Sequence, residues 1–314
     1  MIANNIIRKP GRLGMFVAVA DNETNGVMTS PDGITWTART QSSQSYWYGL
    51  AWSPELNLLV AVATGGEVMT SPDGINWTAR TQSGDGSWTS VCWSPELSLF
   101  VAVAQTGTKR VMTSPDGITW TDRTQSSDSG WWSVCWSPEL SLFVAVAYTG
   151  TKRVMTSPDG ITWTDRTQSS DTDWRSVVWS PELSLFVAVS YEGTNRVMTS
   201  PDGITWTDRT QSNNSFWTGI GWSPELSLFV AVAWSDGFSG TNRVMTSPDG
   251  INWTEQTHSY TASWWSVCWS PELSLFVMVA ISGIEYVATS PDGITWTDRT
   301  PSINTGWRSV VWVP

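Results

Sequence analysis

The sequence predicts an all-β fold: a seven-bladed β-propeller with four antiparallel strands per blade, in which the C-terminal strand closes the first blade. Three observations predict it. The phrase S-P-D-G-I-T/N-W occurs seven times. Successive copies begin 41, 43, 43, 43, 47 and 43 residues apart, a period typical of a four-stranded blade. The two ends of the chain also read as complementary parts of a single unit.

Each unit contains four short runs rich in β-branched and aromatic residues, which we name strands A to D in chain order. In one unit they are residues 131–136, 142–147, 154–156 and 161–166. The turn S-P-E-L separates A from B, and the turn S-P-D-G separates C from D. Proline in the second position fixes φ, and serine in the first position can bond to the backbone. The pattern therefore predicts an antiparallel meander.

The termini predict how the ring closes. Residues 306–314 read as a strand A without a strand B, and residues 12–20 read as a strand B without a strand A. Pro314 aligns with Pro54, and Arg12 aligns with Glu55. Pairing these ends removes the unpaired edge of an open array. We expect one domain, 1–314, with blade 1 from 12–40 plus 304–314 and blades 2–7 from 41–81, 82–124, 125–167, 168–210, 211–257 and 258–303; residues 1–11 have no assigned role.

Composition excludes several functions. Seventeen basic and 28 acidic residues give a net charge of -11, the wrong sign for holding nucleic acid or anionic lipid. One histidine and three scattered cysteines provide no metal cluster and no Cys-His nucleophile, so we expect no metal and no cofactor. Cys92, Cys135 and Cys268 share one position of the repeat and are expected to be free and buried fillers.

No membrane insertion is expected, because the longest apolar runs are far shorter than the roughly 20 residues of a spanning helix. Residues 13–20 follow three basic residues and end in an A-x-A pattern, like a secretion signal. Closely similar phrases recur throughout the chain, so we interpret it as a strand. The sequence leaves the compartment unknown, with a virion or cell surface as the candidates.

The S-P-D-G-I-T-W phrase at the C–D turn resembles the Asp-box, or BNR repeat, of sialidase-like β-propellers, in a shortened form that spans essentially the whole chain. The resemblance implies the fold more than a function, because such boxes occur in glycosidases, lectin-like modules, assembly factors and phage or bacterial surface proteins. From the residues alone, we expect each box aspartate to accept hydrogen bonds from its own turn and each box tryptophan to fill the space between blades. One carboxylate per turn is too few for calcium.

A sialidase would need an arginine cluster, a tyrosine nucleophile paired with a glutamate, and an aspartic acid around the channel. In this chain most arginines repeat on strand D or just before strand C, where they indicate edge charge and solubility. Most glutamates repeat in the A–B turn. Only Arg175 and Arg308 fall on inner strands. We assign no catalytic residues and expect that the protein is not an enzyme.

Differences between the units indicate a binding face. The A–B and C–D turns barely change, whereas the B–C and D–A loops differ in every copy. In a meander the A–B and C–D turns lie on one side of the disc, which we name the constant face. The B–C and D–A loops lie on the other side, which we name the variable face. The residue after the first tryptophan of strand A also varies, and its neighbour is expected at the end of strand B. The candidate ligand-binding residues at this channel mouth are Trp132, Tyr148, Arg175, Tyr191, Trp234, Trp265 and Arg308.

Aromatic and cationic side chains of this kind stack on sugar rings or hold a carboxylate. The alternative is that they only cover the core. We expect a non-enzymatic recognition or structural propeller of a surface, virion or tail assembly that binds a glycan or a protein with its variable face. The alternatives are a sialidase-type glycoside hydrolase and a purely architectural component, which would make its protein contacts through the constant face.

Overall fold

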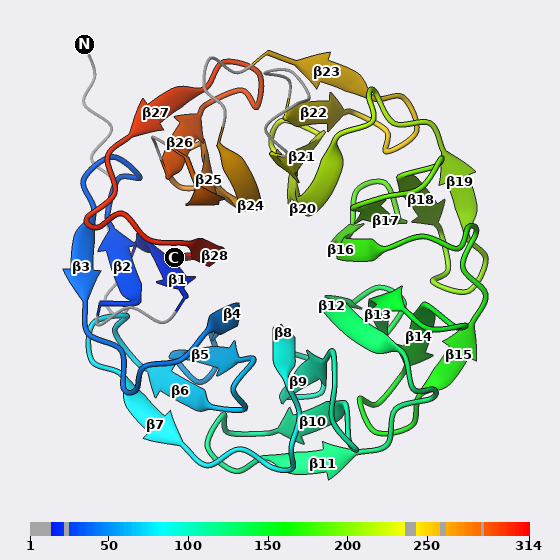
Figure 1. Ribbon diagram of the computed structural model, residues 1–314, viewed down its shortest axis with the longest axis horizontal. Helices are drawn as coiled ribbons and strands as arrows, with labels where there is room; N and C mark the ends of the chain where they lie inside the picture. The colour runs from blue at the N-terminus through cyan, green and yellow to red at the C-terminus, as the bar shows by residue number, and fades with distance from the viewer. Residues whose placement is uncertain (1–13, 22–24, 236–242, 258–261, 284–285) are drawn as a thin grey trace.

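The computed structural model describes residues 14–21, 25–235, 243–257, 262–283 and 286–314. It confirms the predicted fold: seven four-stranded antiparallel sheets stand around a central axis, with strand A innermost and strand D on the rim (Figure 1). The described residues form strands and turns only. Accordingly, that part of the chain contains no long apolar helix that could cross a bilayer.

The strands follow the repeat closely, in the order A to D within each blade. Blade 1 is β28 (Trp307–Val313), β1 (Met15–Ala20), β2 (Val27–Ser30) and β3 (Thr37–Arg39); blade 2 is β4 (Trp47–Ser53), β5 (Leu58–Ala63), β6 (Val68–Ser71) and β7 (Thr78–Arg80). Blade 3 is β8 (Trp88–Ser94), β9 (Leu99–Ala104), β10 (Val111–Ser114) and β11 (Thr121–Arg123); blade 4 is β12 (Gly130–Ser137), β13 (Leu142–Thr149), β14 (Val154–Ser157) and β15 (Thr164–Arg166). Blade 5 is β16 (Trp174–Ser180), β17 (Leu185–Ser190), β18 (Val197–Ser200) and β19 (Thr207–Arg209). Blade 6 is β20 (Phe216–Ser223), β21 (Leu228–Trp234), β22 (Val244–Ser247) and β23 (Thr254–Gln256); blade 7 is β24 (Ser263–Ser270), β25 (Leu275–Ser282), β26 (Val287–Ser290) and β27 (Thr297–Arg299).

Blade 1 is completed by the C-terminal strand, as expected. β28 pairs antiparallel with β1, and the register places Val313 opposite Met15 and Val311 opposite Val17. β1 is the strand that the signal-like segment was expected to form. Arg12, the expected partner of the closing turn, lies outside the described residues. Each sheet in the ring then has strand A as its inner edge at the channel and the short strand D as its outer edge on the rim (Figure 1).

The C–D turns confirm the expected role of their aspartates. Asp32 Oδ1 accepts the backbone N–H groups of Ile34 and Thr35 at 2.8 and 2.7 Å. The glycine that follows has a φ of 73° at Gly33, and its equivalents have similar values. A Cβ on Gly117 would lie 2.8 Å from Leu58 Cδ2 on the preceding blade. Glycine therefore serves both the left-handed turn and the close approach of two blades.

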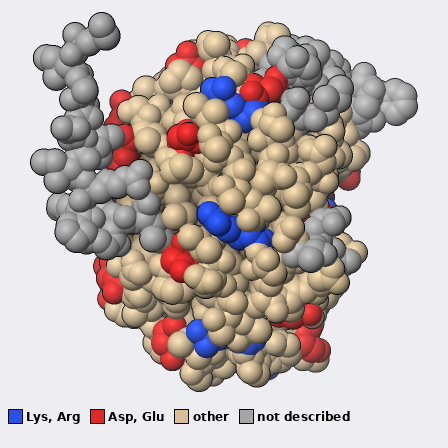
Figure 2. Space-filling view, turned by 90° about the vertical axis from the view of Figure 1, so that its left-hand side faces the viewer, with Lys and Arg blue, Asp and Glu red and all other residues tan. Residues whose placement is uncertain are grey.

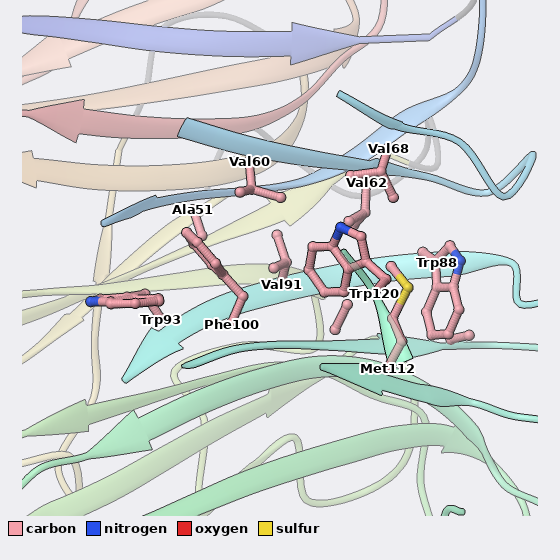
Figure 3. Close-up of a cluster of buried hydrophobic side chains, with 12 residues drawn as sticks. Ala51, Val60, Val62, Val68, Trp88, Val91, Trp93, Phe100, Met112 and Trp120 are labelled. Carbon is pink, nitrogen blue, oxygen red and sulfur yellow. The ribbon is translucent and has the colours of Figure 1, made fainter. Parts of the chain in front are cut away.

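The core lies between blades rather than within one. Figure 3 shows one such layer, in which Val60 and Val62 of blade 2 face Trp88, Phe100 and other side chains of blade 3. The first tryptophan of strand A is fully buried in every blade. The tryptophan of the C–D turn packs in the same layers and donates its indole N–H to the turn glycine, as Trp120 does to Gly117 O at 3.1 Å. Box tryptophans thus fill the inter-blade space, as expected.

The glutamate of each A–B turn ties its blade to the next. Trp136 Nε1 on blade 4 donates to Glu96 Oε2 on blade 3 at 2.7 Å. The same bond occurs at five other junctions between blades. At the junction of blades 1 and 2, where Arg12 stands in the position of the glutamate, Trp52 Nε1 is buried without an acceptor among the described residues. These turns are therefore structural, as the sequence indicated.

The repeated arginines were interpreted from the sequence as charge at the sheet edges. The structure adds a second role, because they also donate hydrogen bonds within and between blades. On strand D, Arg123 Nε donates to Thr113 Oγ1 of the same blade at 2.9 Å. Before strand C, Arg110 Nη1 donates to Ser129 O in the D–A loop of the next blade at 2.8 Å. Arg243 is 1% exposed. On the rim seen in Figure 2, acidic and basic side chains are interspersed.

The three cysteines are free thiols, as expected. They are half-buried rather than fully buried, and each packs against an apolar cluster between two blades. Burial raises the pKa of all three thiols, so they stay protonated and unreactive at neutral pH.

Candidate ligand site at the channel mouth

A β-bulge in strand A builds the site in all seven blades. In β4 the register passes from Trp47 opposite Ala63 to Gly49 opposite Val62, which leaves Tyr48 unpaired. The equivalent step occurs in every other blade. Bulges re-aim side chains at barrel rims and functional sites. In this ring the bulged residues are Tyr48, Thr89, Trp132, Arg175, Thr218, Trp265 and Arg308, all of which line one cavity on the channel axis.

This cavity has a volume of about 120 Å³. Below the bulged residues, its wall carries Ser90, Ser133, Ser176, Ser266 and Ser309 at equivalent positions on five inner strands. Several of these hydroxyls accept a backbone N–H from the next blade, as Ser133 does from Val177 N at 3.3 Å. A hydroxyl that accepts in this way keeps its own proton to donate. The cavity therefore offers a ring of hydroxyl groups.

Two arginines enter the cavity, and each is held by an aspartate. Arg175 contacts Asp173 through Nε and Nη2, both at 2.7 Å. Arg308 contacts Asp21 through Nε at 2.9 Å and Nη2 at 2.8 Å. Each pair uses one edge of the guanidinium, which leaves the Nη1 edge without an acceptor among the described residues. The site thus has two fixed cations, each with hydrogen-bond donors to spare.

Aromatic rings surround both arginines. The Arg175 guanidinium carbon lies 4.0 Å from the Trp132 ring centroid and 4.9 Å from that of Tyr148. The Arg308 carbon lies 4.3 Å from Trp265 and 4.7 Å from Tyr48. The rings also touch one another across the channel, with Trp132 and Trp265 centroids 6.4 Å apart. Stacking and ion pairing together lock both guanidinium groups in one orientation.

Burial shifts two pKa values at this site. Desolvation raises the pKa of Asp173, although the neighbouring Arg175 opposes the shift. Desolvation also raises the pKa of Tyr48, against the positive charge of Arg308. Tyr48 therefore stays a neutral hydrogen-bonding group at neutral pH, while Asp173 holds its proton to a higher pH than an exposed aspartate does.

The structure places the seven candidate residues in three settings. Four of them, Trp132, Arg175, Trp265 and Arg308, line the cavity. Tyr148 and Tyr191 instead flank Arg175 from outside it, at 4.9 and 5.3 Å.

Trp234 belongs to a second cluster, in which its ring centroid lies 5.7 Å from those of both Tyr191 and Phe216. The guanidinium of Arg196 covers the Phe216 ring at 5.4 Å. The expectation that all seven residues share one mouth is therefore corrected for Trp234. In the described part of the structure it lies in a neighbouring cluster that meets Arg175 through Tyr191.

Sequence reasoning also missed part of the site. It expected each variable residue of strand A to neighbour the end of strand B, and side-chain contacts confirm this for Trp132 with Tyr148, Arg175 with Tyr191 and Arg308 with Asp21. It did not expect the β-bulge, which takes the variable residue out of the strand pairing. A spacing signal exists: Trp131 and Val134 are both buried three residues apart, which breaks the two-residue period of a strand. Asp173 was not among the candidates, and Tyr48 was left out although it occupies the variable position.

The described residues contain no group of three His, Cys, Asp or Glu side chains placed to hold a metal ion. Among the described arginines, only Arg175 and Arg308 line the cavity. The site therefore combines two arginines, each paired with an aspartate, with aromatic walls and hydroxyl groups.

No family model matches this sequence, and no curated protein matches it. Solved structures match it in fold. Periplasmic gluconolactonase of Pseudomonas aeruginosa has a TM-score of 0.68 and 12% identity, covering 96% of this chain and 99% of that one. The GH74 enzyme of Niastella koreensis has a TM-score of 0.62 and 17% identity, covering 93% and 56%. YCF48 bound to D1 peptide has a TM-score of 0.60 and 15% identity, covering 81% and 82%. At such identities the likeness shows the fold alone.

These neighbours correct one expectation. The sequence analysis expected no enzyme, because the arginine cluster of a sialidase is missing. Two of the neighbours are named as enzymes, a gluconolactonase and a GH74 enzyme. Propellers similar in fold to this chain thus include proteins named as enzymes other than sialidases, so the missing cluster does not exclude an enzyme.

Proposed function

We propose that the channel mouth binds a small sugar acid, that is, a polyhydroxy compound bearing a carboxylate. The observation that carries the proposal is that the free edges of two guanidinium groups and a ring of serine hydroxyls open into one cavity of about 120 Å³. Guanidinium edges pair with carboxylates, and hydroxyl groups exchange hydrogen bonds with sugar hydroxyls. The cavity takes one small acid or one end of a longer chain.

The proposal is tested by calorimetric titration with gluconate and glucuronate, using glucose as the uncharged comparison. We expect the acids to bind and glucose to bind at least about tenfold more weakly, the loss of one charge-assisted contact. The informative variant is Arg175→Gln with Asp173→Asn, because it removes both charges and leaves neither one buried and unpaired. Arg123→Gln on the rim is the control.

The double variant should lose acid binding while keeping a wild-type melting temperature within a few degrees. Equal binding of glucose and gluconate, or undiminished binding by the double variant, would contradict the proposal. Trp132→Ala and Trp131→Ala provide a second comparison of neighbouring residues. The first should weaken binding, whereas the second removes a fully buried ring and should cost about 3–5 kcal/mol of stability.

A second candidate is hydrolysis of a sugar lactone at the same cavity, because one neighbour of the same fold is named a gluconolactonase and Asp173, held against Arg175 at the edge of the cavity, has a raised pKa. Asp173 does not line the cavity itself but borders it through Arg175, and a carboxylate in such a place can accept a proton from an attacking water. Because the pKa of Asp173 is raised, the rate should increase with pH, and the midpoint of this increase should lie above the pKa of an ordinary aspartate. Ring opening of gluconolactone in a pH-stat tests this function. Asp173→Asn should remove activity and keep product binding; an unchanged rate would exclude Asp173 as the base.

A further inference from the structure

The constant face concentrates negative charge. Each described A–B turn contains one glutamate and each C–D turn one aspartate, giving six glutamates and seven aspartates on this side of the disc. None of these S-P-E-L and S-P-D-G turns contains a lysine or an arginine. The described cations lie instead on the D strands, in the B–C loops and at the channel mouth. The described turns of the constant face therefore carry negative charge only, whereas the rest of the described surface carries both signs.

The same turns expose aliphatic side chains. Twelve of the thirteen large hydrophobic residues exposed on the described surface belong to them, and the other is Tyr46. The leucines of the A–B turns are 38–41% exposed, and the isoleucines of the C–D turns are 40–50% exposed. The two turns of blade 2 are in contact, because Asn57 Nδ2 donates to Pro72 O at 3.1 Å. Leucine and isoleucine side chains thus recur around one face instead of being scattered singly.

Internal hydrogen bonds hold these carboxylates in place and leave them charged. The glutamates accept an indole N–H through one carboxylate oxygen, as Glu139 does from Trp179 at 2.7 Å, and these residues remain exposed. The aspartates accept backbone N–H groups, which lower the pKa of Asp73 to about 2 although partial burial opposes the shift. Neither bond brings a cation to the face. The negative charge is preorganised, and the described turns themselves contribute no lysine or arginine to this face.

We propose that the constant face is a docking surface for a partner protein whose contact surface combines lysine or arginine with aliphatic side chains. Charge complementarity selects the partner, because such a surface neutralises the carboxylates while its apolar residues cover the leucines and isoleucines. A second copy docking face to face would oppose two acidic surfaces. Nucleic acid and anionic membranes carry the same sign and are repelled as well.

The test measures binding of an amphipathic helical peptide with lysines on one side and leucines on the other, by fluorescence anisotropy with the full chain. The charge variant combines Glu96→Gln, Glu139→Gln and Glu182→Gln; glutamine can still accept the tryptophan N–H, so the blades stay joined. Its matched control removes three charges from the variable face, through Asp128→Asn, Asp171→Asn and Glu192→Gln. The apolar variant combines Leu97→Ser, Leu140→Ser and Leu183→Ser, with Tyr46→Ser as its control.

We expect both constant-face variants to bind the peptide at least about fivefold more weakly than wild type, and both controls to bind as wild type does. A peptide with serine in place of leucine should also bind more weakly, which separates docking from general attraction to an acidic protein. Equal losses in the charge variant and its control would overturn the proposal. So would binding that is indifferent to the leucine substitutions, or no binding by the wild-type chain.

Discussion

At the scale of single residues, Asp73 and its repeat equivalents combine local structure with charge. Hydrogen bonds from the turn lower the pKa of all seven aspartates, and that of Asp73 and Asp249 to about 2, where an asparagine adds its side-chain N–H. A folded-state pKa below the unfolded value stabilises the fold above the unfolded pKa and loses this effect as the pH falls.

We therefore predict that the contribution of the turn aspartates to stability is complete above about pH 5 and is lost between about pH 5 and 2, as these groups take up protons. The measurement is the urea midpoint of unfolding across this range. The combined Asp73→Asn and Asp249→Asn variant should lose less stability over the same interval, because asparagine can still accept the backbone N–H groups. A variant with the wild-type pH profile would contradict this account.

What the sequence could show about the site also depends on single residues. It singled out the variable position of strand A, because that position changes between units while its neighbours repeat. It could not show that the Arg175 side chain turns back to Asp173. Side chains two residues apart on a regular strand point the same way, but this does not imply a bond between them. The bulge brings them together, and only the buried spacing of Trp131 and Val134 hints at it.

At the scale of elements, the A–B turn does two tasks. It connects two strands, and its glutamate bonds to a tryptophan of the next blade at six junctions. The sequence predicted the turn from its serine and proline but not the bond, because the partner lies about forty residues away. The junction of blades 1 and 2 lacks this bond among the described residues and supplies a natural comparison.

Trp222→Phe should cost about 1 kcal/mol more than Trp52→Phe, the net value of one hydrogen bond. Both tryptophans are half-buried, and both substitutions remove the same atoms. Only Trp222 donates to a glutamate, Glu182, at 2.7 Å. Chemical denaturation of the two variants measures the difference. Equal costs would mean that the indole bond adds nothing to the contact between blades.

At the scale of the whole molecule, the repeat itself made the architecture predictable. Seven copies of one phrase, with turn residues between short β-rich runs, leave few other ways to bury both faces of each sheet. The ends of the chain then determined which strands meet. The variable loops were not predictable in the same way, because each one differs and no second copy shows which residues are structural.

Closure leads to a third prediction. Deleting residues 306–314 removes β28, with the fully buried Trp307, and uncovers the inner edge of β1. We expect Tm to fall by about 10 °C or more, since one buried tryptophan is worth about 3–5 kcal/mol and neighbouring blades lose a face. Calorimetry checks this prediction, with deletion of residues 1–11 as the control. A truncated protein that melts within a degree or two of the full chain would mean that the ring does not depend on β28.

The pairing of β28 with β1 also has a consequence for biosynthesis. The ribosome releases β1 first among the strands and β28 last, so β1 must wait for its inner partner until nearly three hundred residues have been translated. Blades 2 to 7 can form in order as they emerge, while the first sheet keeps an open edge. During this interval β1 of one nascent chain can pair with the β28 strand of another chain made on the same polysome. The order of synthesis thus makes β1 the strand that stays open longest to pairing with another chain.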